Sequence, residues 1–272
     1  MLDLIKSSAA FIKEVIKDTP DYAIVLGSGL GALKDEVEVI NTIPYSEIPN
    51  FPQTTVVGHN GQLIYGLLEG KKVLMMSGRF HYYEGYDMKT VTFPMRVFHL
   101  LGIKNMVVSN ASGGVNPDFR VGDIMLIKDH INFMPEHPLR GANLEEFGPR
   151  FVDMSEAYDS KMLATADAAA KELGIKVHTG IYLGLQGPTF ETPAEYGMVR
   201  ILGGDAVGMS TVPEVIVARH MGMKVFGISI ITDVGGPDIA FSVSHDEVLA
   251  AADTAMPNVI KIVRKLIKDH AI

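Results

Sequence analysis

Short apolar runs rich in β-branched residues alternate along this chain with longer segments of helical periodicity. Runs of the first kind are typical of strands buried on both faces, and amphipathic segments of the second kind are typical of helices. This alternation predicts an α/β fold. The predicted strands are 23–26, 73–76, 106–108, 124–127, 181–183 and 225–231, and the predicted helices are 91–101, 161–173, 194–202, 213–220 and 245–268.

Nothing in the sequence separates the chain into parts. It contains no Ser-rich or Pro-rich linker, no charge block and no internal repeat, so we expect a single domain over residues 1–272. The segment 134–158 is loop-like, contains proline and is long for a connection without secondary structure. Loops of that length are usually functional or lie at an interface.

Composition narrows the classes of partner. There are 24 Lys and Arg against 32 Asp and Glu, a net charge of −8, so net charge does not favour binding to nucleic acid. With no Cys, disulfides and thiolate metal sites are excluded, and a reducing compartment is indicated.

The first 16 residues mix lysines into an apolar pattern, which predicts an amphipathic helix and not a signal peptide. No run of about 18 apolar residues occurs, so we expect a cytoplasmic protein with no membrane partner.

A glycine-rich segment, 27–31, directly follows the first predicted strand. Glycines let backbone N–H groups approach an anion closely, which favours a phosphate site. Two other interpretations remain open, namely a tight turn and the G-x-G-x-x-(G/A) fingerprint of dinucleotide-binding folds. The second would require a full helix after the glycines, whereas residues 37–40 alternate like a strand.

Two further segments follow predicted strands. Residues 78–85 bring together Arg79, which has a planar fork of donors suited to phosphate, His81, a second possible donor, and Tyr83, which suits a sugar face. A hydrated loop with a stacked arginine explains the same residues equally well. Residues 110–114 read as a Gly-rich turn at the end of a strand, where an α/β sheet usually presents its ligand crevice.

The segment 187–195 places Phe190 beside Glu191, a pair that could stack on a planar base and accept its ring N–H groups. Alternatively, Thr192 and Glu195 form a capping box for the next helix and Phe190 is a core residue. Asp233 closes the last predicted strand, as a catalytic acid or as a turn former.

The sequence also bears on a helix cap, a metal site and a nucleophilic serine. Ser210 or Thr211 is expected to cap the helix 213–220, whose N-terminus could also receive an anion. No metal-ligand spacing such as H-E-x-x-H occurs, so no metal is predicted. A nucleophilic serine is also unsupported, because the G-x-S-x-G pattern is missing.

Taken together, these segments resemble those of the trimeric purine nucleoside phosphorylases over nearly the whole chain. The segments that carry the resemblance, in the order of that family, are 27–31, 58–61, 78–85, 110–114, 190–191, 207–214 and 244–248. The resemblance implies a single α/β domain around a mixed, partly barrel-like sheet. It also implies phosphate-dependent cleavage of the bond between a purine and its (deoxy)ribose, in purine salvage, by a homotrimer with phosphate as co-substrate and no cofactor.

The resemblance also assigns residues. Phosphate is expected at Ser28, His59, Arg79, His81, the backbone of Ala111, and Ser210; the sugar at Tyr83, Met209 and His245; and the base at Phe190, Glu191, Val207 and Asp233. The expected catalytic residues are His81, Glu191, Asp233 and His245. Phe151 matches a phenylalanine that the family takes from a neighbouring subunit.

One position departs from the family's commonest pattern. Members selective for 6-oxopurines usually carry Asn where this chain has Asp233, and the related methylthioadenosine phosphorylases carry Asp. An ionised Asp only accepts hydrogen bonds, which favours a 6-amino group. Glu191 and His245 instead fit a 6-oxopurine and a 5′-hydroxyl, so we expect an enzyme for inosine and guanosine that also tolerates adenosine.

Three other interpretations remain as alternatives. A methylthioadenosine phosphorylase differs in substrate preference. A nicotinamide-dependent oxidoreductase would bind NAD(P)H. A noncatalytic nucleoside-binding protein would bind inosine without consuming phosphate.

Overall fold

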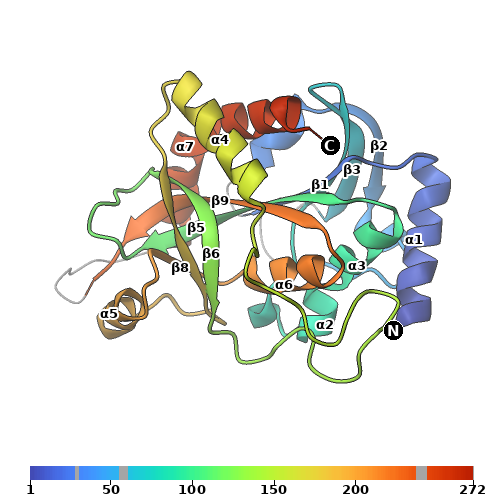
Figure 1. The fold of residues 1–272 in the computed structure, drawn as a ribbon, viewed down its shortest axis with the longest axis horizontal. Helices are drawn as coiled ribbons and strands as arrows, with labels where there is room; N and C mark the ends of the chain where they lie inside the picture. The colour runs from blue at the N-terminus through green and yellow to red at the C-terminus, as the bar shows by residue number, and fades with distance from the viewer. Residues whose placement is uncertain (28–30, 55–60, 237–243, 272) are drawn as a thin grey trace.

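The computed structural model describes residues 1–27, 31–54, 61–236 and 244–271. A mixed sheet runs through the molecule, with helices on both of its faces (Figure 1). Its strands are β1 (Tyr22–Leu26), β2 (Glu38–Pro44), β3 (Gln62–Leu68), β4 (Lys71–Ser77), β5 (Asn105–Gly114), β6 (Ile124–Asn132), β7 (His178–Gly184), β8 (Ala206–Gly208) and β9 (Lys224–Val234). The α-helices are α1 (Leu2–Ile16), α2 (Met88–Val91), α3 (Phe93–Leu100), α4 (Ser160–Glu172), α5 (Pro193–Ile201), α6 (Val212–His220) and α7 (His245–Asp269), and the short 3₁₀ segments are η1 (Gly31–Glu36), η2 (Tyr45–Glu47) and η3 (Tyr82–Glu84).

The strand order explains the partly barrel-like shape. The order is β2-β3-β4-β1-β5-β8-β7-β6-β9, and β9 pairs in addition with β5, so that β5, β8, β7, β6 and β9 form a closed ring. Strand β5 runs parallel to β1 and β9 but antiparallel to β8. The predicted α/β class with a mixed, partly barrel-like sheet is confirmed.

Each face of the sheet packs against its own apolar core. All five residues of β1 are buried, and alternate side chains of a strand point to opposite faces. Ala23 and Val25 therefore join one cluster, while Tyr22, Ile24 and Leu26 join the other. In Figure 1, α4 and α7 cover one face, and α2, α3 and α6 lie on the opposite face.

The sequence prediction was wrong about residues 110–114, which form the end of β5 and not a turn. They pair with β9 along their whole length, and Gly113 and Gly114 also pair with β8. A Cβ on Gly114 would lie only 2.8 Å from Ile231 Cγ2, so a glycine is needed here for the neighbouring strand to approach. Small residues are therefore required where the end of β5 pairs with β8 and β9.

Strand β3, which the pattern missed, pairs with β2, whose start was indicated by the alternation of residues 37–40. Gly66 lies within β3, and a Cβ there would lie 2.3 Å from Glu38 O of β2. The same glycine that weakens the strand pattern in the sequence therefore permits close pairing in the sheet.

Two connections bear on the predicted alternatives. After the first glycines, Gly31 opens the short segment η1, which leads into β2, so no full helix follows as a dinucleotide fold requires. The long connection between β6 and α4 has no helix or strand, as predicted, and it packs Leu144 and Phe147 on the core.

Among the described residues, no helix combines the length and the apolar character needed to cross a bilayer.

Candidate active site

A cavity of about 370 Å³ opens where the carboxyl ends of β4, β5 and β9 meet the start of α7. Ligands of α/β sheets commonly bind at this edge. Its walls combine cationic, hydroxyl, aromatic and carboxyl groups. The lining residues are Arg79, His81, Tyr83, Asn110, Ala111, Ser112, Gly113, Pro188, Phe190, Glu191, Val207, Gly208, Met209, Ser210, Thr232, Asp233, His245 and Val248.

Most of the predicted site residues line this one cavity, although they come from segments far apart in the sequence. The side chains brought together are Arg79, His81, Tyr83, Phe190, Glu191, Val207, Met209, Ser210, Asp233 and His245, with Ala111 beside them. Ser28 and His59, which were predicted to bind phosphate, lie outside the described residues. Phe151 does not line the cavity of its own chain, and its side chain is 88% exposed on the long loop.

Arg79 is fixed from several directions although only 1% of it is exposed. Its guanidinium forms a bidentate pair with Glu214 of α6, in which Nε lies 3.2 Å from Oε1 and Nη2 donates to Oε2. Nη1 donates to Ser109 O at 2.6 Å and to Ser210 Oγ at 3.3 Å. A buried charge needs such partners, and here they set the direction of the guanidinium.

His81 is oriented by Glu84. The carboxylate of Glu84 lies 2.9 Å from His81 Nδ1 and accepts the backbone N–H of His81 at 2.8 Å. The imidazole also stacks on Tyr83, with 4.7 Å between ring centroids. Burial lowers the pKa of His81, as does the nearby Arg79 charge, whereas Glu84 raises it.

The start of α6 differs from the expected cap. Thr211 occupies the N-cap position, but its side chain makes no capping bond, and its φ of 69° is unusual for a residue other than glycine. Instead, Asn110 Nδ2 donates to Thr211 Oγ1 at 2.9 Å, and Ser229 Oγ donates to Asn110 Oδ1 at 2.5 Å. This buried network connects β5, β9 and α6 next to Ser210, which lines the cavity.

The segment before α5 satisfies both of its predicted interpretations in part. Thr192 and Glu195 form the capping box of α5, as expected. Phe190 is not a core residue, however, because it is 39% exposed and lines the cavity. The cap fixes the start of α5, and Phe190 and Glu191 immediately precede it.

Two carboxyl groups lie at one end of the cavity, and both resist ionisation. Burial, helped by the nearby charge of Asp233, raises the pKa of Glu191 to about 7. Burial also raises the pKa of Asp233, while hydrogen bonds from Tyr196 and Thr232 lower it. Carboxyl groups with pKa values perturbed in this way are typical of functional sites.

The sequence analysis missed residues that act through others. Glu214 binds Arg79, from which it is separated by 135 positions in the sequence. Tyr196 donates to Asp233 Oδ2 at 2.6 Å, and these two residues are 37 positions apart. No local spacing indicates either pair, because the fold alone brings them together. The one available signal was a carboxylate inside the predicted helix 213–220, where a buried acid implies a cationic partner.

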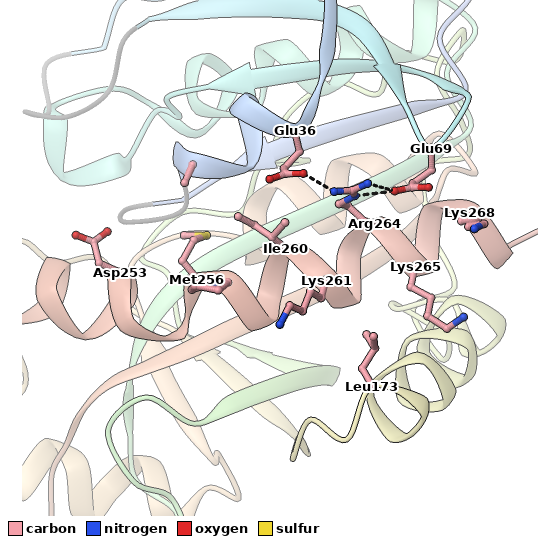
Figure 2. A pocket seen from close by; sticks show the side chains of 12 residues that line it. Glu36, Glu69, Leu173, Asp253, Met256, Ile260, Lys261, Arg264, Lys265 and Lys268 are labelled. Atoms are coloured by element: carbon pink, nitrogen blue, oxygen red, sulfur yellow. Dashed lines mark hydrogen bonds and ion pairs between the residues drawn. The ribbon is translucent and has the colours of Figure 1, made fainter.

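A larger hollow of about 700 Å³ lies away from these groups, along α7 (Figure 2). Two of its charged side chains, Arg264 and Lys265, are held in ion pairs. Arg264 contacts Glu36 and Glu69, and Lys265 contacts Glu172 and Asp269. The hollow is open and has no aromatic lining, so the smaller cavity is the better candidate site. Within the described ranges, no group of three or more His, Cys, Asp or Glu side chains is placed to hold a metal ion.

Comparison with known proteins shows the family of the chain. The model of the phosphorylase superfamily matches residues 21–268. Purine nucleoside phosphorylase 1 of Geobacillus stearothermophilus is 49% identical over 267 residues, covering 98% of this chain and 97% of the relative. Mouse purine nucleoside phosphorylase is 50% identical over 270 residues, covering 97% of this chain and 93% of the relative.

Solved structures give the same result. The purine nucleoside phosphorylase of Schistosoma mansoni in complex with inosine superimposes with a TM-score of 0.95 at 43% identity, covering 99% of this chain and 97% of the other. The complex of the same enzyme with adenosine gives a TM-score of 0.94 at 43% identity, covering 98% and 97%. The chain therefore belongs to the phosphorylase superfamily, among its purine nucleoside phosphorylases.

Proposed function

We propose that this chain catalyses the reversible, phosphate-dependent cleavage of purine (deoxy)ribonucleosides to the free base and (deoxy)ribose 1-phosphate. One observation carries the proposal. A single cavity has Arg79, His81 and Ser210 among its walls, together with Phe190 and the carboxyl pair Glu191 and Asp233. The first group suits an oxyanion, and the second suits a purine ring with its hydrogen-bonding edge.

The chemistry requires the two ligands to lie on either side of one sugar. Phosphate attacks C1′ from the face opposite the base, the C1′–N9 bond breaks, and its electron pair leaves with the purine. Positive charge on the sugar and negative charge on the base are then stabilised by the phosphate and by a donor near N7. Holding the reactants in line contributes up to roughly 7–11 kcal/mol in favourable cases.

Each predicted residue has a role in this scheme. We assign phosphate to Arg79, His81, Ser210 and the backbone of Ala111, and the sugar to Tyr83, Met209 and His245. The base is assigned to Phe190, Val207, Glu191 and Asp233. Ser28 and His59 complete the phosphate assignment from the sequence resemblance.

We also propose that the enzyme is a homotrimer in which Phe151 reaches the site of a neighbouring chain. Phe151 is 88% exposed and does not line the cavity of its own chain, so its side chain is accessible to a neighbouring chain. The proposed reaction needs phosphate as co-substrate and no cofactor.

A phosphate-dependent assay with four nucleosides tests the proposal. We expect turnover of inosine and guanosine and slower turnover of adenosine, with no product when phosphate is omitted. Exclusive use of methylthioadenosine would overturn the assignment in favour of a methylthioadenosine phosphorylase, which Asp233 also fits. Binding of inosine without consumption of phosphate would instead indicate a noncatalytic protein.

A further inference from the structure

Tyr196 contacts the part of the cavity that is assigned to the base, although the proposed function gives this tyrosine no role. It lies in the first turn of α5 and is 1% exposed. Its hydroxyl donates to Asp233 Oδ2 at 2.6 Å, which is the usual length for a hydroxyl donor and an ionised carboxylate. Asp233 itself lines the cavity, so Tyr196 acts on the site through that carboxylate.

The backbone around Tyr196 leaves the phenol little freedom to move. A Cβ on Gly113 would lie 2.8 Å from both Tyr196 Oη and Asp233 Oδ2, so both atoms stand against the bare backbone of β5. A Cβ on Gly235 would lie 2.6 Å from Cε1 and Cζ of the ring. Two glycines thus allow the ring and the carboxylate to meet in one fixed geometry.

Hydrogen bonds from neutral hydroxyl groups favour the ionised form of a carboxyl group. Asp233 has two of them, from Tyr196 to Oδ2 and from Thr232 Oγ1 to Oδ1 at 3.1 Å. Among the described residues, the other titratable groups that line the cavity are Glu191, His245, Arg79, His81 and Tyr83, and Glu191 also interacts with the Tyr196 hydroxyl. Glu195 of α5 adds a further negative charge that acts on Glu191.

We propose that Tyr196 is a positioning residue that opposes the protonation of Asp233 and orients its carboxylate, so that the cavity offers an acceptor to the 6-amino group of adenine nucleosides. This inference rests on the function proposed above. A 6-oxopurine requires a proton on Asp233, and the Tyr196 bond opposes that protonation. Tyr196 therefore determines how far the enzyme departs from 6-oxopurine selectivity.

Replacement of Tyr196 by Phe removes the hydroxyl and keeps the ring. We expect kcat/KM for adenosine to fall by about tenfold relative to inosine, because a hydrogen bond to a charged group is lost. The pKa of Asp233 should also rise, so that the acid limb of the adenosine pH–rate profile moves to higher pH. A residue that only supports packing would lower both substrates together and leave that limb in place.

A double-mutant cycle separates action through Asp233 from action on the cavity as a whole. If Tyr196 acts through Asp233, adding Tyr196→Phe to Asp233→Asn should leave the inosine-to-adenosine ratio of Asp233→Asn unchanged. Additive changes in that ratio would overturn the inference. Tyr22→Phe is the matched control, since Tyr22 is equally buried and loses one bond, 2.9 Å to His270 Nδ1, outside the cavity.

A second variant keeps the inference testable if Tyr196→Phe fails to fold. Incorporation of 3-fluorotyrosine at position 196 keeps the shape and makes the phenol a stronger donor, so the ratio should move toward adenosine. A ratio that matches the wild type in both variants, with inosine still consumed, would overturn this inference alone. A wild-type chain that consumes neither nucleoside with phosphate would overturn the proposed function, and this inference with it.

Discussion

At the scale of single residues, we propose that the protonation of the Glu191 and Asp233 pair decides which edge of a purine the cavity can accept. Burial raises the pKa of both carboxyl groups, and the nearby charge of Asp233 raises the pKa of Glu191 further. An ionised Asp233 accepts from a 6-amino group, and a protonated one donates to a 6-oxo group. Substrate choice is therefore a question of where one proton resides.

Asp233→Asn tests this directly. The amide cannot ionise and can donate to a 6-oxo group, so we expect kcat/KM for adenosine to fall by at least about tenfold more than kcat/KM for inosine. Steady-state kinetics with both nucleosides at saturating phosphate measures the difference. An equal fall for both substrates would contradict the role given to Asp233.

The same variant isolates the titration of Glu191. Loss of the Asp233 charge should lower the pKa of Glu191 below its wild-type value of about 7, while burial keeps it above the usual range for a glutamate. An ionised Glu191 accepts N1–H of inosine, so kcat/KM should be present above this pKa and lost as the pH falls through it. Profiles between pH 4.5 and 9 measure the limb, and a profile that stays flat down to pH 5 would contradict the assignment.

At the scale of elements, the site depends on contacts between segments that the sequence pattern describes only one at a time. The pattern located the middle of β1, β4, β7 and β9 because their side chains are buried on both faces. It missed β3, where Gly66 breaks the alternation, and it mistook the end of β5 for a turn because small residues are required there. Chemistry-bearing motifs at strand ends could be found from sequence, whereas pairings such as Arg79 with Glu214 depend on the fold.

The buried ion pair between Arg79, in the loop after β4, and Glu214 of α6 should be among the most costly contacts to lose. Glu214→Gln leaves the buried Arg79 without its countercharge, which we expect to lower the free energy of unfolding by about 3–5 kcal/mol. Urea unfolding followed by circular dichroism measures it. The exposed pair of Lys171 and Asp167 serves as the control, because removal of such a pair costs about 0–1 kcal/mol. Similar small losses in both variants would show that Arg79 has other sufficient partners.

At the scale of the whole molecule, we propose that the site is shared between chains, with Phe151 assigned to the cavity of a neighbour. We expect sedimentation to give a mass three times the 29.6 kDa of one chain. Phe151→Ala should raise KM for inosine while changing the free energy of unfolding of the chain by less than about 0.5 kcal/mol, because the side chain is exposed. A monomer with full activity, or a variant with unchanged KM, would contradict the shared site.

The central claim is that an oxyanion and a purine occupy opposite ends of the same cavity. A crystal structure of the protein with sulfate and hypoxanthine tests it most directly. The account predicts sulfate within hydrogen-bond distance of Arg79 and Ser210, and hypoxanthine stacked on Phe190 with its edge toward Glu191 and Asp233. Sulfate and hypoxanthine bound in separate cavities would contradict it.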